Sequence, residues 1–105
     1  MSDVEPWIGL VEIVPDEDCE LLRPGRGAYL NVLTLASSAL EFATKVEQAM
    51  AVYKATVMSI TDCAPYKTRF AEATPDDEIR ELHLSLDKPS QVLLATLHTF
   101  PIQSR

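Results

Sequence analysis

The segment from residue 28 to residue 36 reads AYLNVLTLA and is apolar on both of the faces that a β-strand would present. Alternation places Leu30, Val32 and Ala36 on one face, and Tyr29, Leu33 and Leu35 on the other. Such a strand needs protein on both of its sides, because neither side is polar enough to face water. The pattern therefore predicts a sheet with this segment at its centre.

Four further strands and two helices are predicted around this segment. The strands span residues 7–14, 55–62, 66–70 and 91–100, and the helices span residues 39–53 and 75–87. Ser38 and Glu41 have the spacing of a capping box, which marks the start of the first helix. Thr74 as N-cap and Pro75 in the first turn mark the start of the second.

The stretch from residue 80 to residue 88 has a competing interpretation. Leu82, Leu84 and Leu86 alternate as they would in a strand that forms a hairpin with residues 91–100. The start signal before this stretch favours a helix, and both interpretations stay open at the level of sequence.

The predicted elements follow the order β-β-α-β-β-α-β along a single α+β domain of residues 1–105. Without the first strand, this order resembles the β-α-β-β-α-β arrangement of ferredoxin-like folds. The resemblance implies two helices on one face of a mainly antiparallel sheet, with strands 28–36 and 91–100 at its centre. The N-terminal strand would be an additional one, at an edge or paired with a partner. This fold serves many functions, so the resemblance implies none in particular.

The second face of the predicted sheet is the feature that bears most directly on whether the protein forms an oligomer. Strand 91–100 is also apolar on both faces, and two helices on one side would leave the other side in water. Soluble monomers rarely expose a large apolar patch, so a second subunit, a ligand or the chain's own segment 15–27 should cover it. We predict a homodimer.

The negative charge of the chain is concentrated at its N-terminal end. The net charge is −7, and residues 1–20 contain no Lys or Arg and seven acids, Asp3, Glu5, Glu12, Asp16, Glu17, Asp18 and Glu20. The remaining 85 residues contain nine acids and nine bases. This distribution argues against nucleic acid or an anionic membrane as the main partner. It favours a basic protein partner that contacts Asp16, Glu17, Asp18 and Glu20.

Cysteine usage and the N-terminal sequence predict a cytoplasmic protein. Cys19 and Cys63 are 44 positions apart and match no redox or zinc signature, and the first residues lack a secretory signal. The acidic stretch 16–20 lacks the alternating ligands and the glycine of a calcium loop. We therefore expect neither a metal nor a cofactor.

Candidate chemistry is sparse. His98 is the natural acid or base, predicted on one side of its strand with Val92 and Leu94, and Cys63 is a nucleophile only if His98 lies beside it. Polar groups for a small ligand would be Tyr29, Asn31, Tyr66 and His98. The sequence favours a non-enzymatic protein-interaction or regulatory module that uses the acidic segment and an apolar sheet face. The alternative is a small-ligand-binding dimer or a small enzyme with a pocket near His98.

Overall fold

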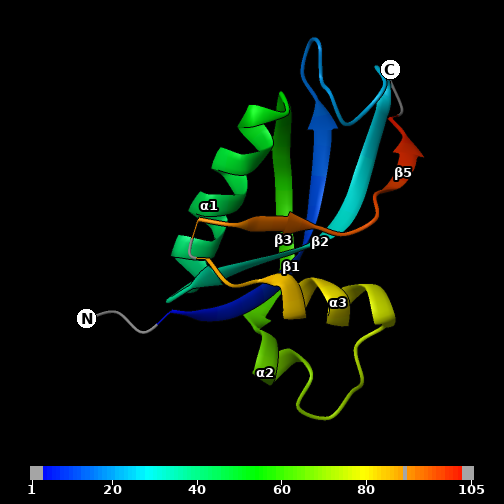
Figure 1. Ribbon diagram of the computed structural model, residues 1–105. Helices are drawn as coiled ribbons and strands as arrows, with labels where there is room; N and C mark the ends of the chain where they lie inside the picture. The colour runs from blue at the N-terminus through cyan, green and yellow to red at the C-terminus, as the bar shows by residue number, and fades with distance from the viewer. Residues whose placement is uncertain (1–3, 89, 103–105) are drawn as a thin grey trace.

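The computed structural model describes residues 4–88 and 90–102, and it has the α+β architecture that the sequence predicts. Over these residues, a five-stranded sheet packs against three helices (Figure 1). The elements in chain order are β1 (Glu5–Pro15), β2 (Arg26–Ala36), α1 (Ala39–Val52), β3 (Ala55–Pro65), α2 (Tyr66–Arg69), α3 (Asp77–Ser85), β4 (Val92–Leu94) and β5 (His98–Pro101). The pairings between these strands are antiparallel.

The N-terminal strand β1 lies inside the sheet, which has the order β3-β1-β2-β4. The ferredoxin-like order with an additional strand at the edge is therefore not confirmed. β1 forms a hairpin with β2 and offers its second edge to β3, so its backbone groups are paired on both sides. It is also apolar on both faces, since Ile8 is buried on one and Val11 and Ile13 on the other.

The predicted strand 91–100 is two short strands at the edge of the sheet, not one strand at its centre. β4 pairs with the second half of β2 and β5 with the first half. Between them, residues 95–97 lie opposite only two residues of β2. Ala95 packs in the cluster of Leu33 and Leu97 in that of Leu30, so Thr96 is the extra residue that shifts the alternation, as in a β-bulge. As a result Leu94 and Leu97 both face α1, whereas His98 lies on the opposite face. The prediction that His98 shares a face with Val92 and Leu94 was wrong for this reason.

The helix α1 begins where the capping box predicts. The N–H of Glu41 donates to Oγ of Ser38 at 3.1 Å, and Oε1 of Glu41 accepts from the N–H of Ser37 at 2.6 Å. The inner side of the helix then packs on the sheet in a cluster that we call the α1 core. Its main members are Val11, Ile13, Leu30, Val32, Phe42, Val46 and Met50, which are all fully buried.

The helix α3 packs on the face of the sheet that is opposite to α1. Ile8 and Leu33 pair across the β1–β2 ladder and contact Ile79 of α3 rather than α1. We call the cluster of Ile8, Leu33, Ile79, Leu86 and Ala95 the α3 core. The prediction of both helices on one face was therefore wrong. The connection from β3 to β4 joins opposite edges of the sheet and must cross one face, and α1 already occupies the other.

The stretch 66–70 was predicted as a strand, but it forms the short helix α2. Tyr66 and Phe70 are four residues apart, so the spacing that suggested alternation also places them on one side of a helix. Their rings lie 4.8 Å apart, and both pack against the α3 core. For residues 80–85, the helical interpretation is the one observed, and Pro89 lies outside the described residues.

The second face of the sheet is covered over part of its length. β1 and β2 turn partway along, which divides the sheet into a lower half over α3 and an upper half that leads to the connection 16–25 (Figure 1). That connection does not cover the second face, because Leu22 is 7% exposed and packs into the α1 core. Across residues 4–88 and 90–102, no helix has the length and apolar character needed to span a membrane.

Candidate functional site

The acidic connection between β1 and β2 is attached to the turn that joins α1 to β3. The N–H of Asp16 donates to the carbonyl oxygen of Lys54 at 2.9 Å, and the N–H of Glu20 donates to that of Tyr53 at 3.0 Å. The hydroxyl of Thr56 donates to Oδ1 of Asp16 at 2.5 Å. These bonds fix the backbone of the connection and leave the side chains of the predicted interaction residues, Asp16, Glu17, Asp18 and Glu20, exposed.

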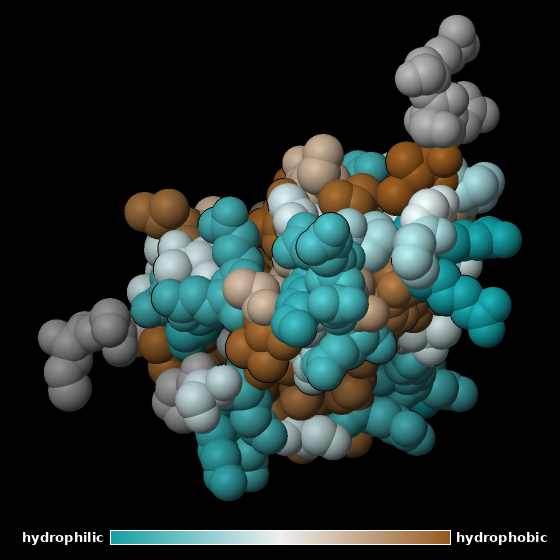
Figure 2. All heavy atoms as spheres, turned by 90° about the horizontal axis from the view of Figure 1, so that it is seen from above, coloured by the Kyte–Doolittle hydropathy of each residue, from teal (hydrophilic) through white to brown (hydrophobic). Residues whose placement is uncertain are grey.

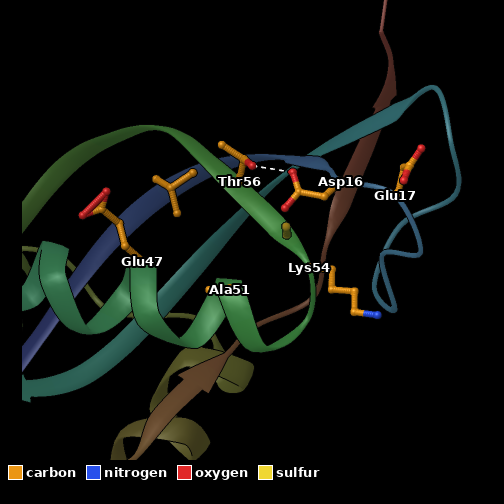
Figure 3. Close-up of a pocket in the computed structure, with 8 residues that line it drawn as sticks. Asp16, Glu17, Glu47, Ala51, Lys54 and Thr56 are labelled. Atoms are coloured by element: carbon orange, nitrogen blue, oxygen red, sulfur yellow. Dashed lines mark hydrogen bonds between the residues drawn. The ribbon is translucent and has the colours of Figure 1, made fainter.

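A cavity of about 590 Å³ lies between this connection, the end of α1 and the start of β3. Three carboxylates line it, from Asp16, Glu17 and Glu47, together with the hydroxyl of Thr56. Figure 3 shows the side chain of Lys54 directed away from Asp16 and Glu17, although Lys54 is one of the lining residues. The rest of the lining is apolar, from Ala51, Ala55 and Val57, so the cavity combines three carboxylates with one cation and an apolar wall.

A second cavity of about 590 Å³ lies on the other side of the same acids. Asp16, Glu17 and Asp18 line it together with Gly25 and Ile102. Seen from above, hydrophilic side chains gather in the middle of this end of the molecule and again at its edges, with hydrophobic patches between them (Figure 2). The acidic connection thus stands between two open hollows at one end of the sheet.

Charges near the end of α1 add to this picture. The last turn of α1 contains no basic residue, Lys54 follows its C-cap Tyr53, and Glu47 lines the same cavity as Lys54. In the described part of the chain, the ion pairs are Lys67 with Glu5 and Arg80 with Asp77, and neither reaches the connection. Of the seven N-terminal acids, Asp3 lies outside the described residues.

The four candidate ligand-binding residues fall into two groups. Tyr29, Asn31 and His98 lie on the upper half of the second sheet face, with Tyr29 directly opposite His98. Tyr66 is elsewhere, in the lower half, where its ring stacks on that of His83 at a centroid distance of 3.8 Å. None of the four cavities described around the molecule is lined by His98.

The upper half of the second face contains a row of four residues in register across four strands. Ser59, Glu12, Tyr29 and His98 lie side by side on β3, β1, β2 and β5. The hydroxyl of Ser59 donates to Oε1 of Glu12 at 3.1 Å. Val14, Asn31 and Phe100 flank this row, and we call the seven residues together the open face.

The structure does not bring Cys63 and His98 together. Cys63 packs against the α1 core, whereas His98 lies on the open face, across the sheet. Burial raises the pKa of the Cys63 thiol, which opposes formation of the thiolate that a nucleophile needs. Among the residues placed by the structure, no cluster of His, Cys, Asp or Glu side chains is suited to hold a metal ion.

Two acids of potential importance were not singled out by the sequence. Glu12 alternates with Val11 and Ile13, which identifies its face but not the residues beside it. Glu47 reaches the acidic end because the connection is bonded to the turn after α1, and no local pattern indicates that contact. Comparisons with protein families, with curated proteins and with solved structures find no match for this chain.

Proposed function

We propose that the protein is a non-enzymatic interaction module whose acidic end binds a Lys- or Arg-rich segment of another protein. The observation that carries the proposal is the group of exposed carboxylates around the two cavities. Asp16 and Glu17 separate these cavities, and Glu47 joins them from α1.

Charge complementarity is the main physical support. Exposed acids repel one another and the end of the helix dipole, so grouping them costs stability unless a cation offsets it. The ion pairs within the described residues lie elsewhere, at Glu5 and Asp77, so these carboxylates are available to a partner. An extended basic segment could insert side chains into both hollows while its backbone crosses Asp16 and Glu17.

Cellular location is part of the same proposal. Cys19 and Cys63 are free thiols, which suits a reducing compartment, and we place the protein in the cytoplasm. The interaction would be steered by charge and would weaken as salt increases, because the Debye length is only about 8 Å at physiological ionic strength.

The test is a titration of the protein with a synthetic octa-lysine peptide, followed by amide chemical shifts in NMR. We expect the largest shifts at residues 16–20, 47 and 54–57, and an affinity that decreases with added salt. The triple variant Glu17→Gln, Asp18→Asn and Glu20→Gln should bind at least about tenfold more weakly. It spares Asp16, which accepts a hydrogen bond from Thr56.

A matched control separates a site from general attraction to an acidic protein. The variant Glu72→Gln, Glu81→Gln and Asp87→Asn removes three other exposed acids and changes the net charge equally. It should bind the peptide about as well as the unmodified protein. Equal losses in the two triple variants would rule out a binding site at the acidic end.

A further inference from the structure

The open face is arranged so that it is complementary to a second copy of itself. Its middle strand, β2, contributes Tyr29 and Asn31, which are both neutral. The charged or chargeable members flank this strand, with Glu12 on β1 to one side and His98 on β5 to the other. Neighbouring strands are about 4.8 Å apart, so the acid and the imidazole are about equally far from Tyr29.

We propose that the open face is the interface of a homodimer whose two-fold axis runs along β2, above Tyr29. Rotation about such an axis exchanges the two sides of β2. Glu12 of each copy then faces His98 of the other, and the protein forms the same pair twice. The attraction is an ion pair when the imidazole is protonated.

The residues of β2 beside the proposed two-fold axis are compatible with their own copies. A residue on the axis meets its own copy, so a charged side chain there would repel itself. Tyr29 meets a second aromatic ring, and the Asn31 amide has both donors and acceptors for its counterpart. Tyr29 is 41% exposed in the single chain, although it is the centre of the face.

In the next row of the open face, apolar residues on the two sides of β2 would also meet across the interface. Phe100 lies opposite Gly27, with its ring 5.2 Å from that of Tyr29, and Val14 lies on the other side of β2. The rotation that pairs Glu12 with His98 brings Val14 against Phe100. Aligned sheets pack about 10 Å apart with interdigitating side chains, which suits residues of this size.

The helix α3 leaves this face accessible. It packs on Ile8 and Leu33 in the lower half of the sheet, and Figure 1 shows it below the upper strands. Within its own chain, His98 lies opposite Tyr29, and Oε2 of Glu78 accepts from the N–H and the hydroxyl of Thr96, two residues before His98. Glu12 has the Ser59 hydroxyl as its neighbour. None of these contacts supplies a cation to Glu12.

The test uses two charge reversals, Glu12→Lys and His98→Glu, and the dissociation constant from sedimentation equilibrium at about pH 6. Each variant alone places like charges together twice in the dimer. We expect each to dimerise about tenfold more weakly than the unmodified protein. An equimolar mixture of the two should form a heterodimer with near-normal affinity, since every pair is again of opposite sign.

Mixing is decisive because it cannot repair a defect within one chain. Circular dichroism shows whether each variant is folded. If a charge reversal unfolds the protein, the neutral single variants Glu12→Gln and His98→Gln are used in place of the two reversals. Those two variants should each weaken dimerisation, and their mixture should recover part of the loss, because the heterodimer contains one Glu12–His98 pair beside one neutral pair. The control Glu72→Lys makes the same charge change at an exposed position away from the open face and should leave dimerisation unchanged.

Three results would overturn the proposal. One is a protein that stays monomeric up to about 1 mM at about pH 6, a concentration at which even a weak interface is populated. Another is a dimer that neither reversal weakens. The third is a failure of the mixed variants to recover the affinity that each has lost.

Discussion

A β-carbon added at Gly9 would lie 2.8 Å from Cε2 of Phe42, closer than two carbon atoms can approach. The pairing of β1 with β3 shifts register beside Gly9, between Ile8 and Leu10. The absence of a side chain at this position therefore lets the ring of Phe42 pack directly against the backbone of β1.

The substitution Gly9→Ala should destabilise the fold by about 1–3 kcal/mol, because the fully buried ring of Phe42 must shift within the α1 core to admit a methyl group. Urea denaturation measures the change. The double variant with Phe42→Leu should lose less than the sum of the two single changes, since the smaller side chain relieves the contact. A Gly9→Ala protein within about 0.5 kcal/mol of the original would show that the ring adapts.

The start of α3 provides a second prediction. Oδ1 of Asp76 accepts from the N–H of Ile79 at 2.9 Å, so Asp76 is the N-cap, and the expected cap Thr74 lies two residues before it. Asp76→Ala should cost about 1 kcal/mol in the free energy of unfolding. Thr74→Ala, at an exposed position, should change it by less than about 0.5 kcal/mol. A larger loss of unfolding free energy for Thr74→Ala than for Asp76→Ala would identify Thr74 as the N-cap instead.

Sequence patterns predicted the elements better than their arrangement. The capping box at Ser38 and Glu41 and the two-faced strand 28–36 are local features, and both are found as expected. The position of β1 depends on a pairing with β3 that is distant in the chain, and α3 crosses the second face because α1 occupies the first. Neither relation leaves a periodic signal in the sequence.

The candidate sites also differ in whether local sequence patterns could predict them. Asp16, Glu17, Asp18 and Glu20 are neighbours in the chain, so their grouping needed no structure. The row formed by Glu12, Tyr29 and His98 depends on strand register, and a single extra residue at Thr96 decides which face His98 occupies. A one-residue shift in register moves every side chain to the other face, which is why alternation alone misplaced His98.

Tyr66 predicts how stability responds to alkaline pH. Burial raises the pKa of its hydroxyl above the ordinary value of about 10, and nearby Arg80 partly offsets this. The folded state thus holds this proton more tightly than the unfolded state does. The contribution is complete below about pH 10 and is lost as the pH rises through the raised pKa.

Urea denaturation between about pH 8 and pH 11 checks this sign. The free energy of unfolding should fall at the alkaline end, and Tyr66→Phe should make the fall shallower because its ring cannot ionise. A Tyr66→Phe protein with the original slope would assign the alkaline loss to other groups.

The thiol of Cys63 should react slowly with thiol reagents in the folded protein. Its side chain packs against the α1 core, and burial raises its pKa, so little thiolate is present at neutral pH. In a Cys19→Ser variant, which leaves Cys63 as the remaining cysteine, modification by Ellman's reagent at about pH 7.5 should be at least about tenfold slower than in urea. The Cys63→Ser variant measures Cys19 under the same conditions.

Rapid modification of Cys63 without urea would instead reveal an accessible, activated thiolate and would support a nucleophile on β3. Slow modification, with His98 on the far side of the sheet, favours an interaction module over an enzyme that uses this cysteine.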